Sequence, residues 1–282
     1  MPGRCRRFAA AALLAALAAF EAIGAVARAE DDAFPGIGAA YLVRVGGETP
    51  WSRNSAKPLA PASLTKLMTA LLVDEAGKPD DIVTITAPAA AATGSRLGVR
   101  AGERYRVSAL LSAALIGSAN DACLALALWR DGTETAFVTH MNARARQLGL
   151  RDTHFRNACG HDAAGHVSTA ADLLRLAEAA MAREGVAREV RRVDAEIATA
   201  DRARRTHVTN RNALVGRYPG AIGVKSGFTS KAGKCVIALA RRRGVDAWVV
   251  LLDARNRWWD AHSLLDRAFE WHDRRVAAPP EP

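Results

Sequence analysis

The order of the predicted elements favours an α+β fold in which a helical segment is inserted into a sheet-forming one. Apolar residues with strand-like spacing occur near the start, at 37–44, and again near the end, at 234–241 and 247–253. Between them, several stretches within about 87–205 have apolar residues at helical spacing, and one further helix is predicted at 260–271. Strands at both ends with helices between them are typical of a sheet covered by helices.

The first elements are a β-hairpin and a buried helix. Residues 37–44 predict a strand, Gly46-Gly47 a turn, and the residues around Trp51 a short partner strand. The helix at 63–75 is apolar on most sides, so it is expected to lie in the core. Residues 82–86 alternate like a short strand.

The middle and the end of the chain continue this pattern. Helices are expected at 107–129, broken by a turn at Ser118-Ala119-Asn120-Asp121, at 133–148, at 169–183 with Ser168 or Thr169 as the cap, and at 186–192. Strands at 221–225, 234–241 and 247–253 and the helix at 260–271 follow.

A serine lies three residues before a lysine at the start of the helix 63–75. Ser63 and Lys66 therefore project side by side from one helix face. Exposed N–H groups and the helix dipole favour a developing anion at this end. A lysine whose pKa is lowered by burial and nearby cations can activate a serine hydroxyl as a nucleophile. The same spacing also fits an N-cap serine followed by a solvated lysine.

Two further motifs favour the catalytic interpretation. Ser118-Ala119-Asn120 matches Ser-x-Asn, and Lys225-Ser226-Gly227 matches Lys-Thr/Ser-Gly. The three motifs in this order are the signature of penicillin-binding proteins and serine β-lactamases. The chain resembles the low-molecular-weight penicillin-binding proteins, the serine D-alanyl-D-alanine carboxypeptidases of peptidase family S11.

This resemblance covers nearly all of the chain after residue 30 and implies a transpeptidase/β-lactamase-like fold. In that fold a mostly antiparallel sheet is covered by helices. An all-helical lobe, about 87–205, would be inserted into an α/β lobe formed by 30–86 and 206–276, with the active site between the two lobes.

The resemblance also implies acyl transfer from the amide between two D-alanines. Ser63 is expected to be the nucleophile and Lys66 its general base, while Lys225 lowers the pKa of Lys66 by like-charge repulsion. Ser118 is expected to relay a proton to the leaving amine. Asn120 is expected to hydrogen-bond the substrate backbone and the Lys66 amine.

The expected substrate-binding residues are Lys225, Ser226, Gly227, Phe228, Thr229 and Arg257. The backbone N–H groups of Ser63 and Phe228 would form the oxyanion hole, and Lys225, Ser226 and Thr229 would recognise the terminal carboxylate. A bidentate arginine suits the same carboxylate. Arg257 occupies the family's arginine position, counted back from Leu264-Leu265, with Arg255 as the alternative. A solvated loop arginine remains the other interpretation.

Some residues depart from the family pattern, and these departures restrict which activities are expected. Lys-Ser-Gly keeps the hydroxyl of the usual Lys-Thr-Gly, and Ala158-Cys159-Gly160-His161 replaces Pro-His-Gly-Leu. His161, Asp162 and His166 are interpreted as loop residues, and no metal or cofactor is expected. No Glu-x-x-x-Asn element follows the helical lobe, which argues against efficient β-lactamase activity.

The leading hypothesis is a D,D-carboxypeptidase that trims peptidoglycan stem peptides ending in D-Ala-D-Ala and is inhibited by β-lactams. A D,D-endopeptidase that cuts peptidoglycan cross-links is the alternative. An inactive peptidoglycan- or penicillin-binding protein is a third interpretation. The motifs do not separate the two peptidases.

The N-terminal residues 1–29 predict a cleavable signal peptide. They comprise a positive region with Arg4, Arg6 and Arg7, an apolar run at 8–20, and a small-x-small site at Ala27-Arg28-Ala29. Glu21 interrupts the apolar run, which argues against a permanent membrane span. We expect a periplasmic or secreted protein without a stable membrane anchor, with residues 277–282 as a disordered tail.

The chain is basic, with a formal net charge of +10 at pH 7. Such a charge attracts nucleic acid, anionic lipid or an anionic cell-wall polymer. No basic run with interleaved aromatic residues occurs, so nucleic acid is not expected as a partner.

Three cysteines remain after removal of the predicted signal: Cys123, Cys159 and Cys235. Cys123 and Cys235 lie in apolar segments, where buried thiols are common. Cys159 lies in a predicted loop and is the one expected to react or pair. No disulfide framework is expected.

Overall fold

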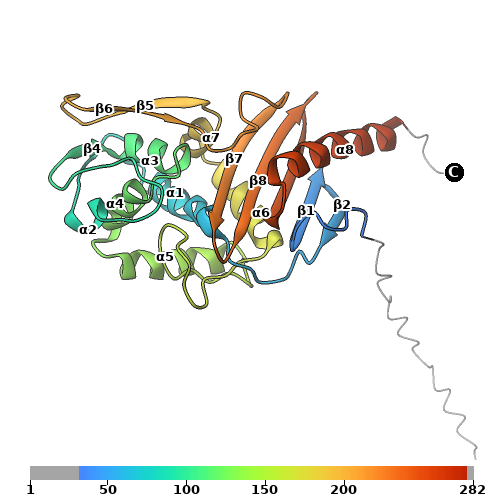
Figure 1. The fold of residues 1–282 in the computed structure, drawn as a ribbon, viewed down its shortest axis with the longest axis horizontal. Helices are drawn as coiled ribbons and strands as arrows, with labels where there is room; N and C mark the ends of the chain where they lie inside the picture. Colours follow the sequence, from blue (N-terminus) through green and yellow to red (C-terminus); the bar gives the residue numbers. More distant parts are fainter. Residues whose placement is uncertain (1–31, 278–282) are drawn as a thin grey trace, which may run out of the picture. The chain divides into compact units, whose positions relative to one another are not determined.

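The computed structural model describes residues 32–277 (Figure 1). The predicted signal peptide and all but the first residue of the predicted tail lie outside this part of the chain. A five-stranded antiparallel sheet has the order β2-β1-β9-β8-β7. Its strands are β1 (Ala40–Val45), β2 (Glu48–Arg53), β7 (Ala221–Thr229), β8 (Gly233–Arg242) and β9 (Val245–Ala254). The first hairpin and the last three strands therefore meet in one sheet.

One face of this sheet is covered by α8 (Arg257–Ala277), which Figure 1 shows lying across the strands. The buried side chains of α8 are Ala261, Leu264, Leu265, Ala268 and Phe269. Their spacing of three and four residues forms a single apolar stripe. The stripe packs against Tyr41 and Val43 of β1 and Val249 and Leu251 of β9.

The other face packs against α6 (Ala170–Met181), which packs in turn on α1 (Lys66–Glu75), in the larger of two hydrophobic clusters. All eight residues of 66–73 are buried, as expected for a helix that is apolar on most sides. The Thr169 side chain caps α6 by accepting a hydrogen bond from Asp172 N at 3.1 Å, which confirms the predicted cap.

The segment between the two sheet-forming parts is mostly helical. Its helices are α2 (Ala87–Ala90), α3 (Val107–Leu115), α4 (Asn120–Asp131), α5 (Glu134–Gln147), α6 and α7 (Glu184–Val190). Two small sheets pair β3 (Ile82–Thr84) with β4 (Arg104–Arg106) and β5 (Asp194–Ala198) with β6 (Arg205–Thr209). The lobe expected to be all-helical thus also contains β4 and β5.

The α+β, mostly antiparallel architecture predicted for a transpeptidase-like chain is confirmed. Two elements that carry the motifs differ from the predicted ones. The predicted helix 63–75 begins as a 3₁₀ turn, η1 (Ala62–Thr65), before α1 starts at Lys66. The strand predicted at 221–225 extends to Thr229, so Lys225-Ser226-Gly227 lies within β7. Within residues 32–277, no helix has both the length and the apolar character that crossing a membrane requires.

Candidate active site

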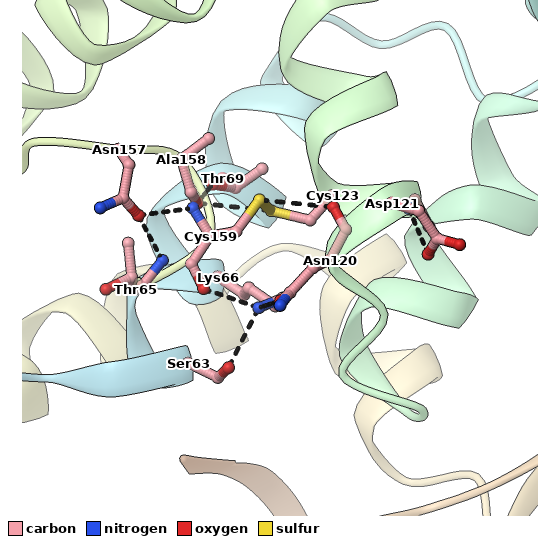
Figure 2. The surroundings of a disulfide bond; sticks show 12 residues. Ser63, Thr65, Lys66, Thr69, Asn120, Asp121, Cys123, Asn157, Ala158 and Cys159 are labelled. Carbon is pink, nitrogen blue, oxygen red and sulfur yellow. Dashed lines mark hydrogen bonds between the residues drawn. A yellow bond between two sulfur atoms is a disulfide. The ribbon is translucent and has the colours of Figure 1, made fainter. Parts of the chain in front are cut away.

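Ser63 and Lys66 lie in contact at the junction of η1 and α1. Lys66 Nζ lies 3.0 Å from Ser63 Oγ (Figure 2). The same nitrogen donates to Asn120 Oδ1 at 2.6 Å and to the carbonyl oxygen of Cys159 at 2.6 Å. Asn120 is the first residue of α4, and its amide also donates to Thr93 O at 2.6 Å. The first two motifs therefore meet at the Lys66 amine.

The Lys66 amine is buried, and the groups that it contacts are neutral. Burial lowers the pKa of Lys66 well below its ordinary value, and the charge of Lys225 lowers it further. The carboxylate of Asp121 opposes this shift. A neutral lysine that contacts a serine hydroxyl can take the proton of that hydroxyl.

The third motif supplies a second serine–lysine pair. Lys225 Nζ of β7 donates to Ser118 Oγ at 3.0 Å and to Ser226 O at 3.1 Å. Burial lowers the pKa of Lys225 to about 7, with further contributions from the charges of Arg211 and Arg257. Ser118 has a φ of +58°, a strained backbone conformation for a serine and one common at functional sites.

The backbone of β7 passes close to the amide of Ser63. A Cβ atom on Gly227 would lie 2.9 Å from Ser63 N and 3.0 Å from Ala62 Cβ, so the site requires glycine there. Phe228 is the next residue, and its side chain is 61% exposed. The two N–H groups expected to form the oxyanion hole thus belong to adjoining segments.

The other predicted substrate-binding residues lie along β7. Arg257, at the start of α8, donates from Nη1 to Gly227 O at 2.6 Å, whereas Arg255 is exposed. Ser226 Oγ donates to Arg211 O at 3.3 Å. Thr229 Oγ1 donates to Asp162 Oδ1 at 2.6 Å, so its hydroxyl already has a partner.

The loop that carries the altered Ala158–His161 sequence contributes contacts that the sequence does not reveal. Cys159 supplies the carbonyl that binds Lys66, and Asp162 binds both Thr229 and the backbone N–H of Lys231. A Cβ atom on Gly160 would lie only 1.9 Å from Ala62 O, so this glycine packs directly on the turn before Ser63.

His166 supports the same turn from behind. Its Nδ1 accepts from Arg156 N at 3.0 Å, so Nε2 carries the proton and donates to Thr65 Oγ1 at 2.9 Å. Thr65 in turn donates to Ala62 O at 2.8 Å. Burial lowers the pKa of His166 to about 4, so the ring is neutral near pH 7. Among residues 32–277, no group of three or more His, Cys, Asp or Glu side chains is arranged to hold a metal ion.

Cys159, the cysteine expected to react or pair, does form a disulfide, whereas the expectation that Cys123 is an ordinary buried thiol is wrong. Cys123 on α4 and Cys159 in the loop are joined, with 6.0 Å between their Cα atoms, and Cys235 remains a buried thiol. The two cysteines are 36 residues apart, and the loop reaches α4 only through the folded packing. The loop position of Cys159 identified one partner from the sequence, but nothing in the sequence identified Cys123 as the other.

Comparisons with known proteins agree with this geometry. A family model for D-alanyl-D-alanine carboxypeptidases matches residues 46–256. The chain is 33% identical over 243 residues to D-alanyl-D-alanine carboxypeptidase DacF of Bacillus subtilis, over 83% of this chain and 62% of DacF. It is 31% identical over 218 residues to a D-alanyl-D-alanine endopeptidase of Pseudomonas aeruginosa, over 75% of this chain and 69% of that protein.

A solved structure shows the same fold. The Streptomyces K15 DD-transpeptidase superposes with a TM-score of 0.78 at 27% identity, over 83% of this chain and 97% of that one. This chain spans about three fifths of the length of DacF. The family model matches most of the present chain. The chain therefore belongs to the D-alanyl-D-alanine carboxypeptidase family, peptidase family S11, among the low-molecular-weight penicillin-binding proteins.

Proposed function

We propose that this protein is a serine D-alanyl-D-alanine carboxypeptidase that removes the terminal D-alanine from peptidoglycan stem peptides. The observation that carries the proposal is the contact of 3.0 Å between the buried Lys66 amine and Ser63 Oγ. A buried lysine with a lowered pKa next to a serine is the arrangement needed to activate that serine.

Acylation begins when neutral Lys66 takes the proton of Ser63 while Oγ attacks the carbonyl carbon between the two D-alanines. The negative charge that develops on the carbonyl oxygen is stabilised by the backbone N–H groups of Ser63 and Phe228. Ser118, hydrogen-bonded to Lys225, gives its hydroxyl proton to the leaving D-alanine amine and takes up the proton held by Lys66, which leaves Lys66 neutral. The bond between Ser63 Oγ and the penultimate D-alanine forms as the peptide bond breaks.

Deacylation requires a water molecule and a base. Once the proton has left with D-alanine, Lys66 is neutral again and can activate that water. Attack on the ester releases the shortened peptide and returns the proton to Ser63. Penicillins carry a strained amide that acylates a serine in the same way, so we propose β-lactams as inhibitors that trap Ser63.

We propose that two cationic side chains beside β7 recognise the terminal carboxylate of the substrate. Lys225 and Arg257 both lie at this strand, and each contributes a positive charge near the Gly227 backbone. Ser226 and Thr229 provide hydroxyl groups next to them. A guanidinium binds a carboxylate with two parallel hydrogen bonds, which suits Arg257 to this role.

We further propose that the protein acts outside the cytoplasm, in the periplasm or after secretion. The sequence of residues 1–29 has the pattern of a cleavable signal. The disulfide between Cys123 and Cys159 supports the proposal, because such bonds persist in oxidising compartments.

The activity is tested with three substrates and one control variant. A pentapeptide ending in D-Ala-D-Ala should yield free D-alanine, measured with a D-amino-acid oxidase assay, and Ser63→Ala should yield none. The same peptide with a C-terminal amide should be a poor substrate, since it lacks the carboxylate. Conversion of a cross-linked peptide dimer to monomers without D-alanine release would instead identify an endopeptidase.

A further inference from the structure

The Cys123–Cys159 disulfide joins two segments that both contact the Lys66 amine. Cys123 lies on the first turn of α4, and Cys159 lies in the loop between Asn157 and His161. Figure 2 shows the Lys66 amine hydrogen-bonded on one side to the Cys159 carbonyl and on the other to Ser63. The disulfide therefore ties α4 to the loop directly beside the proposed general base.

Each of these segments supplies one acceptor to Lys66. Asn120 lies three residues before Cys123 on α4, so both project from one side of that helix. Asn120 Oδ1 and the Cys159 carbonyl oxygen both lie 2.6 Å from Lys66 Nζ. The disulfide thus fixes the separation of two acceptors that bind the same nitrogen.

These two acceptors determine where the Lys66 lone pair points. A neutral amine carries two N–H groups and one lone pair in a tetrahedral arrangement. If the N–H groups donate to Asn120 Oδ1 and Cys159 O, the lone pair is directed at the remaining neighbour, Ser63 Oγ, at 3.0 Å. A shift of either acceptor would let the amine rotate and turn an N–H group toward Ser63.

We propose that the Cys123–Cys159 disulfide is a positioning element for the general base, so that acylation of Ser63 depends on the oxidised state of this bond. This inference rests on the proposed function, because it assigns Lys66 the role of base. It adds that the catalytic geometry requires a cross-link between α4 and the loop.

Other contacts hold the loop next to Cys159, so loss of the disulfide leaves the loop folded. Thr69 Oγ1 donates to Ala158 O at 2.6 Å, and Ala158 N donates to Glu134 Oε1 at 2.9 Å. They fix Ala158. Asn157 Oδ1 also accepts from Cys159 N at 3.3 Å and from Gly160 N at 2.7 Å, so the disulfide acts together with these bonds in setting the position of the Cys159 carbonyl. The expected effect of reduction is therefore local to Lys66.

Both cysteines are buried, but Cys159 lines a recess of about 240 Å³ through which a small reductant can approach. A water-soluble phosphine that attacks there breaks the S–S bond. With one water molecule it yields two thiols and the phosphine oxide, so the phosphine supplies the two electrons.

The test compares acylation by a penicillin in oxidised wild type, phosphine-reduced wild type and Cys123→Ala/Cys159→Ala. Saturation kinetics separate the acylation rate constant from the dissociation constant of the complex formed before acylation. Binding of the same penicillin to Ser63→Ala, oxidised and reduced, gives that dissociation constant independently. Thiol counting and thermal melting confirm the redox state and the folded fraction of each sample.

We expect the acylation rate constant to fall at least about tenfold on reduction and in the double variant, since small misplacements of catalytic groups have effects of this size. Binding should change by less than about twofold, and reoxidation of wild type should restore the rate. The reductant should not alter the double variant. Leu265, a buried residue of α8, provides a stability control. Leu265→Ala should lower the melting temperature and leave the acylation rate constant unchanged.

Two outcomes overturn the inference. One is a reduced wild type that retains the rate of the oxidised protein, and the other is a Leu265→Ala variant that loses rate in step with its stability. Either result would leave the proposed function intact. Failure of the oxidised wild type to form any adduct would contradict the proposed function itself, and the inference with it.

Discussion

At the scale of single residues, the position of Ser63 depends on the backbone on both sides of it. Ala62 adopts a φ of +48°, and its carbonyl oxygen accepts a hydrogen bond from Thr65. Gly160 and Gly227 approach this turn so closely that neither position leaves room for a side chain. Small residues around Ser63 are therefore required by the packing of three segments.

Gly160→Ala should slow acylation of Ser63 by about a hundredfold, because the new methyl group would displace the Ala62 carbonyl and with it the nucleophile turn. Gly149→Ala is the matched control. Gly149 also has a positive φ, but an added Cβ meets nothing within 4 Å. The control should cost about 1 kcal/mol of stability and leave the penicillin acylation rate unchanged. Equal rates for the two variants would contradict this account.

At the scale of elements, the first turn of α4 carries most of the lobe's contribution to the site. Asn120 binds Lys66, Cys123 forms the disulfide, and Asp121 accepts hydrogen bonds from three backbone N–H groups of residues 97–99. Asp121 is fully buried and is also the charge that opposes the lowering of the Lys66 pKa. The first turn of α4 therefore holds the loop at residues 97–99 and also influences the pKa of Lys66, the proposed base.

Asp121→Asn should lower the free energy of unfolding by about 2 kcal/mol, because buried N–H groups lose a charged acceptor. It should also lower the pKa of Lys66 further, which moves the acidic limb of the acylation profile to lower pH. Asp172→Asn alters another buried carboxylate, which accepts hydrogen bonds from Asp152 N and Thr153. Urea denaturation should show a similar loss for both variants, and a shifted pH profile for Asp172→Asn would argue against the role given to Asp121.

The elements that could be predicted from sequence are those with a long periodic signal. The helices α1 and α6 and the strands β8 and β9 were predicted within a few residues, since their apolar patterns span three turns or a full strand. The short elements α2 and β4 were not predicted, because three or four residues carry too little pattern.

The site was predictable only where residues share a motif. Ser63 and Lys66 are neighbours on one turn, and family motifs supplied Ser118, Asn120 and Lys225. The contacts of Cys159 with Lys66 and of Asp162 with Thr229 join residues 93 and 67 positions apart. Such pairs are set by tertiary packing, which periodicity and composition do not encode.

At the scale of the whole molecule, two lysines are buried in the core that joins the sheet to the lobe. Unfolded lysine holds its proton up to about pH 10.5, whereas folding lowers the pKa of Lys225 to about 7. Between these values the unfolded chain binds more protons than the folded one. The contribution of Lys225 to the free energy of unfolding must therefore rise with pH in this window.

Urea denaturation at pH 7 and pH 9.5 should show this rise in wild type. Lys225→Met removes the titrating group and should make the increase smaller, even if other groups shift both curves. A pH dependence that is identical in the two proteins would mean that Lys225 is not held in a low-pKa environment.

The central claim is that Lys66 and the surrounding groups activate Ser63 as a nucleophile. Intact mass spectrometry after exposure to a penicillin tests it most directly, with Ser63→Ala treated in parallel. This account predicts that wild type gains the mass of one penicillin per chain and that Ser63→Ala, equally folded, gains none. A folded wild type without an adduct, or an adduct that persists in Ser63→Ala, would contradict it.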